Sequence, residues 1–579
     1  MKKRILRVLI AVVMLIGMLP TAIFAVETPE AKWAFGTAET APDNSAYTYS
    51  GTLAEAFTAA NGNVDATNTV TYVKLNKDVS MTHTSLATAL TLNEGKAMVL
   101  DLNSKTYSSS TTSTSGADTT YGINTEPNSL LTVKNGTISV SSSNDGYAIG
   151  IQSKGNLNVL NCTIGASKSN ANSGAYGIYY RGGVATITNC TITATSVGDR
   201  AQGIEIGTTT PALTIADCTV NAIGGDEAYA FYASDYFGKM EFDVAGTITA
   251  TCANGAFYSK PTTNEVTVTA GEAESTATDA DAAVAATYAN KYVKIEPVKY
   301  DLYIGGVQVT SANKDDITTA IGNAASGTAT YDPETSTLTL NNFSYTGEGY
   351  NYTSNVYALI YSTGIDLKIV LKGTNTFAGI DNYQEGIIIE NGSLTIANSD
   401  ADDVMGSLKL TAGYPVICVV DGSLFVENVN LTVINTLSPT GNPGEAILVT
   451  GDISITNSDV TAISGDSNGD DIPEEGATFG ILTMGSISVT NSIVSATGYY
   501  GGMWANSLSV TNSIVTAAGN YFALCVGDSY PVEGLVPTLN GKFIVTAGND
   551  AASAVKVDSP TDAHTQTSMS ESSLSAQLP

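Results

Sequence analysis

Short runs of alternating apolar and polar residues return along this chain at a nearly constant interval. One marker of the repeat is a small residue placed just before Thr-Ile or Thr-Val. It occupies Gly136, Cys162, Cys190, Cys218 and Gly246, so successive copies lie 26, 28, 28 and 28 residues apart. A second marker keeps the same register at Ile151, Ile178, Ile204, Phe231 and Phe257. A period of this length, built from β-branched runs and Gly or Asn turns, predicts a parallel β-helix.

A second and less regular series of runs follows Pro297. Its markers are Leu359, Ile387, Ile417, Ile447, Ile481, Met503 and Leu524. Their uneven spacing indicates loops of different length between strands that still stack. Ahead of the series, Gly305-Gly306 separates two strand-like runs, which predicts a hairpin at the start of this second part.

We therefore predict an all-β fold of two tandem right-handed parallel β-helix solenoids with a short N-terminal capping helix. Leu53, Ala56, Phe57 and Ala60 form an apolar stripe at helical spacing, and a helix there would cover the open strand edge of the first solenoid. The right hand follows from the usual rule for crossovers between parallel strands. The expected parts are residues 1–25 as a signal peptide, 26–70 as the cap region, 71–298 as the first β-helix, 299–556 as the second β-helix with its hairpin start, and 557–579 as a disordered Ser/Thr-rich tail.

The first residues have the layout of a secretory signal. Lys2, Lys3, Arg4 and Arg7 precede an apolar stretch, and Ala25 is a plausible cleavage point. The alternative is an uncleaved anchor, although the apolar stretch is short for a membrane span. No later segment is long and apolar enough to cross a bilayer, so we expect a secreted or cell-surface protein.

The charge of the chain is strongly acidic. It has 55 acidic and 25 basic residues and a formal net charge of −30. This balance argues against nucleic acid and against anionic lipid as partners, and it leaves carboxylates free to bind cations.

Three of the six cysteines share one column of the predicted repeat. Neighbouring rungs of a parallel sheet lie about 4.8 Å apart and their side chains point the same way, which is poor geometry for a disulfide. We favour a ladder of buried free thiols, with a disulfide as the alternative that export makes possible.

Catalytic residues are scarce. The chain has two histidines, His83 and His564, and only Arg181 and Arg200 remain as arginines outside the signal. Cleavage of a polysaccharide needs paired carboxylates or a base beside them, and the adjacent Asp pairs of this chain fall in turns without basic partners. We expect no enzymatic activity; carboxylates distant in sequence that converge on one face are the alternative.

The best candidate for a metal site is an acidic loop at 466–475. Oxygen-bearing residues alternate there as in a calcium-binding loop, although Asp471 and Ala477 depart from the usual pattern. Calcium is therefore the one cofactor that the sequence suggests, and a solvated acidic loop is the alternative. The candidate ligands are Asp466, Asn468, Asp470 and Glu474.

Tyrosines gather on one predicted outer face of the first solenoid. If the second marker points inward, the residues beside it point outward and stack from rung to rung. Rows of aromatic rings with amide and carboxyl groups suit sugar rings, which stack on aromatic faces and form hydrogen bonds at their edges. Packing of these rings against one another is the alternative. The candidate glycan-binding residues are Tyr176, Tyr179, Gln202, Glu205, Tyr229, Tyr232 and Tyr258.

The corresponding column of the second solenoid is apolar. An apolar stripe of this length should be covered by loops, by the first solenoid or by a partner protein, unless the inward and outward positions are reversed. Its residues are Ile360, Ile388, Cys418, Leu448, Leu482, Trp504 and Cys525.

Three stretches resemble a known family. The run Leu100-Asp101-Leu102-Asn103, the Asn-Cys-Thr-Ile rungs, and Tyr300-Asp301-Leu302-Tyr303 resemble secreted or surface pectate-lyase-like right-handed β-helix proteins of Gram-positive bacteria, of carbohydrate-binding or adhesin type. The resemblance covers most of 70–550. It implies a surface location and contact with polysaccharide or host glycan, sometimes with calcium, but no catalytic residue of the lyases has a match here.

These observations together predict an exported, non-catalytic cell-surface protein that binds polysaccharide or host glycan through an exposed β-helix face. The alternatives are a structural stalk or adhesin that contacts protein, and a divergent polysaccharide lyase. No nucleic-acid partner and no membrane span after removal of the signal are expected.

Overall fold

The computed structural model describes most of the chain between residues 28 and 569. The described ranges are 28–37, 42, 46–65, 68–83, 90–111, 118–198, 200–224, 227–233, 238–259, 261–280, 290–380, 384–399, 404–413, 415–436, 444–464, 478–498, 501–519, 522–526, 543–546, 554–558 and 567–569. The expected signal peptide, the candidate calcium loop and His564 lie outside these ranges.

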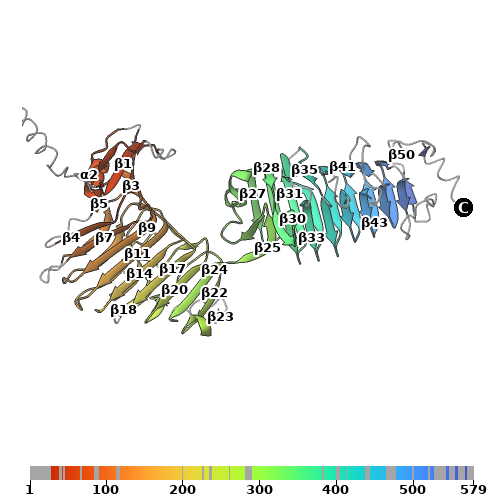
Figure 1. Ribbon diagram of the computed structural model, residues 1–579. Coiled ribbons are helices and arrows are strands. Elements are labelled where there is room, and N and C mark those ends of the chain that lie inside the picture. The colour runs from red at the N-terminus through yellow and green to blue at the C-terminus, as the bar shows by residue number, and fades with distance from the viewer. Residues whose placement is uncertain are drawn as a thin grey trace, which may run out of the picture. The chain divides into compact units, whose positions relative to one another are not determined.

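The chain divides into two compact units, Met1–Pro297 and Val298–Pro579, whose elements are drawn in Figure 1. Nearly all regular structure is β, and most strand pairs are parallel, so the protein is a parallel β-solenoid. Each unit is described by itself below.

The first unit consists of a large and a small sheet. The large sheet has 17 strands: β1 (Ala31–Gly36), β2 (Tyr49–Gly51), β3 (Val70–Leu75), β4 (Val79–His83), β6 (Ala97–Asp101), β7 (Thr106–Thr111), β9 (Leu130–Ser142), β11 (Asn156–Lys168), β13 (Ala185–Thr188), β14 (Thr191–Ser196), β16 (Leu213–Ala216), β17 (Cys218–Ile223), β19 (Asp243–Val244), β20 (Ile248–Cys252), β22 (Val266–Gly271), β23 (Thr278–Ala280) and β24 (Tyr292–Pro297). The small sheet has 7 strands: β5 (Leu90–Leu92), β8 (Thr120–Thr125), β10 (Ala148–Ser153), β12 (Ala175–Tyr180), β15 (Arg200–Ile206), β18 (Glu227–Tyr232) and β21 (Gly255–Phe257).

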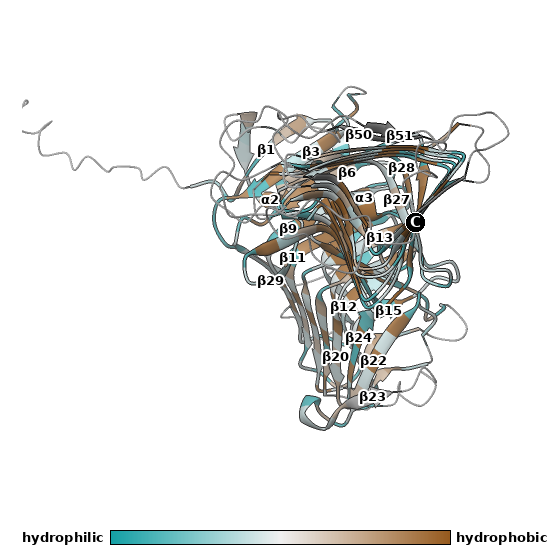
Figure 2. Ribbon diagram, turned by 90° about the vertical axis from the view of Figure 1, so that its right-hand side faces the viewer, coloured by the Kyte–Doolittle hydropathy of each residue, from teal (hydrophilic) through white to brown (hydrophobic). Residues whose placement is uncertain are grey.

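The register of the small sheet follows the sequence repeat. Ile151 pairs with Ile178, Ile178 with Ile204, Ile204 with Phe231 and Phe231 with Phe257. All five side chains are buried in one core between the two sheets. In Figure 2 brown segments alternate with paler ones along the strands, as expected where one face of a strand is buried. The prediction that this marker points inward is confirmed.

The turn column explains why Asn recurs beside Cys. Asn135, Asn161 and Asn189 have φ angles of 61°, 53° and 52°, a left-handed conformation that Asn tolerates better than most residues. Their amides bond along the column, with Asn189 Nδ2 donating to Asn161 Oδ1 at 2.7 Å. The neighbouring thiols of Cys162 and Cys190 are buried and free and donate to backbone carbonyls, as the column geometry predicts.

Antiparallel strands and a helix stand at the ends of the first unit. Helix α2 (Leu53–Gly62) begins with a capping box between Thr52 and Glu55 and packs its buried stripe against β3 and β5. At the far end β24 pairs antiparallel with both β20 and β22, and a short 3-10 helix, η2 (Glu274–Thr276), follows β22.

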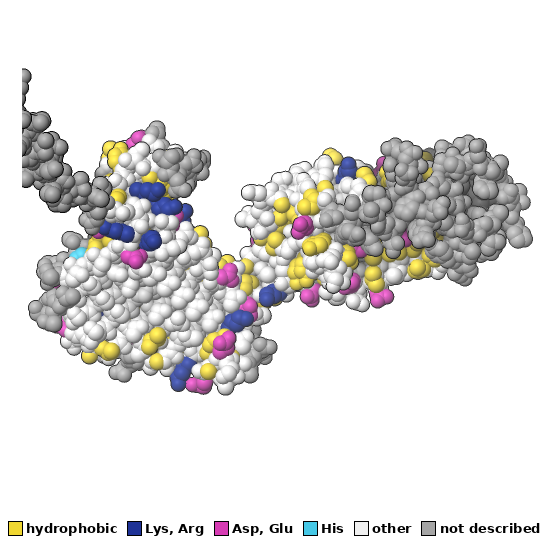
Figure 3. Space-filling view, in the orientation of Figure 1, with side chains coloured by type: hydrophobic (Ala, Val, Ile, Leu, Met, Phe, Trp, Pro, Cys, Tyr) yellow, Lys and Arg dark blue, Asp and Glu magenta, His cyan; other side chains and the backbone are white. Residues whose placement is uncertain are grey.

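The outer face of the large sheet is uncharged over β14 and β17, and in Figure 3 this side of the first unit is mainly white. One of its columns consists of hydroxyl side chains paired rung to rung: Thr106, Thr137, Thr163, Thr191, Thr219 and Thr249.

The second unit also has two sheets. One contains β25 (Lys299–Ile304), β26 (Val307–Thr310), β29 (Tyr350–Thr353), β30 (Val356–Thr363), β33 (Gln384–Glu390), β36 (Ile417–Val420), β39 (Ile447–Val449), β42 (Phe479–Thr483), β45 (Gly501–Ala505) and β48 (Phe522–Val526). The other contains β27 (Ala325–Asp332), β28 (Thr337–Gly347), β31 (Leu367–Lys372), β32 (Thr374–Gly379), β34 (Leu394–Asn398), β35 (Ser407–Ala412), β37 (Leu424–Glu427), β38 (Asn430–Asn435), β40 (Ile453–Thr456), β41 (Asp459–Ser464), β43 (Ser486–Thr490), β44 (Ile493–Gly498), β46 (Ser507–Thr511), β47 (Ile514–Ala518), β49 (Phe543–Thr546), β50 (Ala554–Asp558) and β51 (Thr567–Met569). Helices α3 (Ile317–Ile321) and η4 (Gly322–Ala324) precede β27.

The predicted hairpin is present. Strands β25 and β26 pair antiparallel around Gly305 and Gly306, whose φ angles of 57° and 84° suit a two-residue turn. The stretch expected as a disordered tail contains the short strand β51, which pairs antiparallel with β50.

The predicted apolar column of the second unit is wrong at its first position. Ile360 pairs with Ile387 and lies in the core, whereas Tyr361 pairs with Ile388 and stands at the head of the outward column. A shift of one residue moves a side chain to the other face of a strand, and two adjacent isoleucines concealed that shift. Further along, Leu482, Trp504 and Cys525 form a buried cluster apart from the main core.

None of the helices within the described ranges combines the length and the apolar composition that crossing a membrane requires.

Candidate functional site

A glycine column places two rows of side chains on one outer face of the small sheet in the first unit. In β12 a Cβ on Gly177 would lie 2.4 Å from Ile192 Cγ2 and 2.6 Å from the Gly203 carbonyl oxygen, so only glycine fits between the two sheets there. Tyr176 and Tyr179 stand on either side of the Gly177-Ile178 pair. Ile178 belongs to the core cluster between the two sheets, whereas neither tyrosine does.

The strand register collects all seven predicted glycan-binding residues on this face. Tyr176 pairs with Gln202 and Gln202 with Tyr229 in one row. Tyr179 pairs with Glu205 and Glu205 with Tyr232 in the other, and Tyr258 follows the last inward Phe257. We call this set the tyrosine face; its members are Tyr176, Tyr179, Gln202, Glu205, Tyr229, Tyr232 and Tyr258.

The rings of the tyrosine face form two clusters. The ring centroids of Tyr176 and Tyr179 are 5.7 Å apart. Across β15, the ring centroids of Tyr232 and Tyr258 are 4.5 Å apart, and those of Tyr229 and Tyr258 are 5.4 Å apart. The β15 rung, with its amide and carboxyl groups, therefore lies between two groups of aromatic rings.

The seven residues differ in exposure, which the sequence did not predict. Tyr258 exposes 38% of its surface, but Tyr176 exposes 5% and Gln202 none. The other four are half-buried. The tyrosine face is thus a shallow, partly covered surface and not a fully open row of rings.

Both arginines outside the signal lie at the tyrosine face, a placement that the sequence analysis missed. Arg200 Nε is 2.9 Å from Glu227 Oε2, and the Arg181 guanidinium lies 5.3 Å from the ring centroid of Tyr179. The signal for this was present in the sequence. Arg200 is two residues before Gln202 and Arg181 is two residues after Tyr179, and side chains two positions apart on a strand share a face.

Burial and charge act in opposite directions on the carboxyl group at the centre. Burial raises the pKa of Glu205 to about 7, while Arg200 and Arg181 lower it in part. Burial disfavours the charge of Arg200, but Tyr176 and Glu227 outweigh it and raise the pKa of the guanidinium. Near neutral pH the carboxyl group of Glu205 is therefore partly protonated, beside the charged guanidinium of Arg200.

The second unit has a tyrosine cluster that the sequence analysis did not identify. The rings of Tyr303 and Tyr350 stack with centroids 3.7 Å apart. The hydroxyl of Tyr352 donates to Glu385 Oε2, and that of Tyr361 donates to Glu390 Oε2 at 2.7 Å. The two glutamates bracket the predicted inward marker of β33, which is the signal that could have revealed them. We call these six residues the acidic cluster.

In the acidic cluster, the pKa of the Glu385 carboxyl group is affected by Glu390 and by no arginine. Burial raises the pKa of Glu385 to about 7, with Glu390 adding to the rise and the Tyr352 hydroxyl opposing it. Burial likewise raises the pKa of the Cys418 thiol to about 12, with Glu385 and Glu445 adding to the rise.

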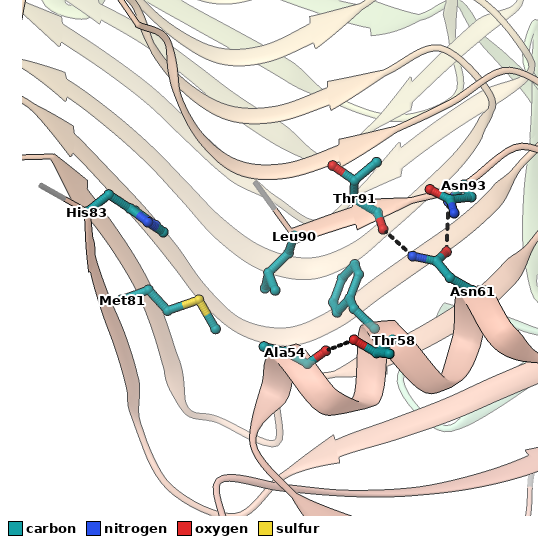
Figure 4. Close-up of a pocket in the computed structure, with 9 residues that line it drawn as sticks. Ala54, Thr58, Asn61, Met81, His83, Leu90, Thr91 and Asn93 are labelled. Atoms are coloured by element: carbon teal, nitrogen blue, oxygen red, sulfur yellow. Dashed lines mark hydrogen bonds between the residues drawn. The ribbon is translucent and has the colours of Figure 1, made fainter. Parts of the chain in front are cut away.

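A pocket of about 310 Å³ lies between α2 and the strands β4 and β5 (Figure 4). His83 and Met81 point into it from one face of β4, as expected for residues two positions apart. Asn61 on its far side donates to the Thr91 carbonyl oxygen at 2.8 Å and accepts from the Asn93 backbone N–H at 2.9 Å. The Asn61 amide thereby ties helix α2 to β5.

Within the described ranges, no three His, Cys, Asp or Glu side chains are grouped so that they could hold a metal ion. The predicted calcium ligands Asp466, Asn468, Asp470 and Glu474 lie outside those ranges.

No protein-family model matches the chain, and no curated protein matches it either. The chain is therefore classified by its architecture alone, as a parallel β-solenoid.

Proposed function

We propose that this protein binds glycan through the tyrosine face of its first unit. The observation that carries the proposal is the β15 rung, with Gln202 and Glu205, set between two clusters of tyrosine rings. The apolar face of a sugar ring stacks on aromatic rings, and the polar groups of the rung would receive its hydroxyls.

The binding is proposed to occur without cleavage. Arg200 is held by Glu227 and Tyr176, and its raised pKa makes it a poor acceptor for a sugar proton. One observation favours a second candidate function, polysaccharide cleavage. Glu205, with its pKa of about 7, lies beside both arginines and has the proton affinity of a general acid or base.

Several finer features belong to the same proposal. The two units are taken as tandem right-handed solenoids, with α2 covering the open strand edge of the first. The chain is taken as exported to the cell surface, with calcium in the 466–475 loop. The resemblance given above supports the right hand, the surface location and calcium, and the packing of the buried stripe of α2 against β3 and β5 supports the cap. A stalk or adhesin that contacts protein is the competing account.

The test is a binding assay with the chain from residue 26 onward, against soluble and insoluble polysaccharides, with and without calcium. The Tyr179/Tyr232/Tyr258→Ala variant should lose at least about tenfold in affinity, because each aromatic contact contributes roughly 0.5–1.5 kcal/mol. Tyr49→Ala is the matched control, since Tyr49 is 49% exposed in the same unit but away from this face.

The assay also measures released reducing or unsaturated ends. Binding that the triple variant loses, without release of product, supports the proposal. Product release would establish cleavage instead, and the absence of binding to every glycan would leave the stalk or adhesin.

A further inference from the structure

Gln202 is the least explained side chain of the tyrosine face. It exposes no surface, and within the described part of the chain neither its amide nitrogen nor its amide oxygen has a hydrogen-bond partner. A buried polar group without a partner destabilises a fold, whereas an apolar side chain of similar size would not. Stability alone therefore does not account for glutamine at this position.

The neighbours of Gln202 place its amide at the centre of the face. Tyr176 and Tyr229 pair with it on the two adjacent rungs, and each belongs to a different ring cluster. Arg200 and Glu205 flank it on the same strand. A sugar ring stacked on either tyrosine cluster would bring its polar edge toward the Gln202 amide.

Arg200 and Glu227 are paired on adjacent strands, two residues before Gln202 and Tyr229. Arg200 and its partner Glu227 expose 42% and 43% of their side chains, and ion pairs exposed to this extent contribute little to stability. Long side chains of this kind can move aside for a ligand at small cost.

We propose that Gln202 selects the ligand of the tyrosine face, and that this ligand is a neutral pyranose sugar with free vicinal hydroxyls. The inference rests on the proposed function. A primary amide presents one donor and one acceptor side by side, and two adjacent hydroxyls present an acceptor and a donor at a similar spacing. The sugar thus satisfies both orphaned atoms at once.

Other common sugar substituents match the amide less well. A carboxylate offers only acceptors, so the Gln202 oxygen would stay unpaired and face a negative charge. The N–H and C=O of a trans acetamido group point in opposite directions, so it satisfies one amide atom and leaves the other.

The test compares Gln202→Leu with Gln152→Leu in the full chain. Gln152 is a matched control, because it is also buried and outward on β10 but donates from Nε2 to Asn124 Oδ1 at 2.8 Å. Gln202→Leu should raise the melting temperature by about 2–4 °C, because it removes two unsatisfied atoms. Gln152→Leu should lower it, because Asn124 Oδ1 loses the hydrogen bond from Gln152 Nε2.

The probes are oligosaccharides of glucose, mannose and galactose, together with their fully O-methylated forms. We expect wild type to bind at least one free oligosaccharide and not its methylated form. Gln202→Leu should weaken that binding at least tenfold, and Gln152→Leu, on the rung beside Tyr179, should weaken it less.

Failure of this inference is distinguishable from failure of the proposed function. If Gln202→Leu binds as wild type does, or melts at a lower temperature, while the tyrosine triple variant still loses binding, Gln202 is structural and only the inference falls. If wild type binds no glycan at all, the proposed function falls with it.

Discussion

The tyrosine face of the first unit and the acidic cluster of the second unit both lie beside the inward markers of their strands, but they carry different chemistry. In both, the residues near an inward isoleucine include tyrosines and a buried glutamate. In the first unit Arg181 and Arg200 lie beside the carboxyl group of Glu205, so its charge has a partner. In the second, Glu385 is met by the Tyr352 hydroxyl and by a further glutamate. The solenoid backbone therefore sets where each glutamate lies, and the neighbouring residues set the electrostatic environment of its carboxyl group.

The largest effect on stability is expected from substituting the glycine before the inward marker, which is Gly177 in the first unit and Gly386 in the second. Gly177→Ala would place Cβ 2.4 Å from Ile192 Cγ2, and Gly386→Ala would place it 2.3 Å from the Val416 carbonyl oxygen. Each substitution should lower the free energy of unfolding of its own unit by about 3 kcal/mol, measured by denaturant titration.

Gly62→Ala is the control for this prediction, because a Cβ there meets nothing within 4 Å. It should change stability by less than about 1 kcal/mol. Wild-type stability of Gly177→Ala would mean that the two sheets are not held as closely as described.

The next effect concerns pH. The pKa of Glu205 and of Glu385 is raised from 4.5 to about 7 in the fold, so the folded state favours the protonated carboxyl. That stability is fully present below about pH 4.5 and is lost as the pH rises through about 7. Glu385→Gln should therefore stabilise the protein at pH 8, by roughly 1–3 kcal/mol relative to wild type, and change little at pH 4.

The corresponding substitution in the first unit is Glu205→Gln. Its gain at pH 8 relative to pH 4 should be close to that of Glu385→Gln, because both carboxyl groups have a pKa of about 7 in the fold and the lowering by the two arginines is already part of that value for Glu205. Urea titrations at both pH values measure the difference. A clearly smaller gain at Glu205 would show that the two arginines hold its pKa below that of Glu385.

The smallest expected effect is that of Arg181 alone on the pKa of Glu205. Arg181→Met removes a positive charge that lowers the pKa of Glu205, so this pKa should rise further, by less than about one pH unit. An NMR titration of the Glu205 carboxyl carbon follows it. Arg181→Lys keeps the charge and should leave the titration near that of wild type, whereas an unchanged pKa in Arg181→Met would contradict the assignment.

The sequence predicted the repeat better than the chemistry around it. The marker at Ile178 and the turn residue Asn161 each follow from a local requirement, an inward apolar side chain or a left-handed turn, and both are visible in a single copy of the repeat. The error at Ile360 arose where that local signal is ambiguous. Ile387 and Ile388 on the neighbouring strand β33 are both apolar, so either of them could be taken as the partner of Ile360.

Features that depend on two rungs at once were harder to predict. The pairing of Arg200 with Glu227 and the hydroxyl of Tyr352 on Glu385 join residues that only the strand register brings together. The orphaned amide of Gln202 is harder still, since it depends on the absence of a partner among all its described neighbours.

The turn column of Asn135, Asn161 and Asn189 has a consequence for how such a chain changes over evolutionary time. Asn135, Asn161 and Asn189 make the same backbone turn, and each amide bonds to the one on the rung before, so a rung depends mainly on its neighbours. Duplication or loss of one repeat would lengthen or shorten the outer face by a single step of about 4.8 Å and leave the remaining steps intact. Under the proposed function, the length of glycan that the outer face could contact would then be set by the number of repeats, which recombination can change without a new fold.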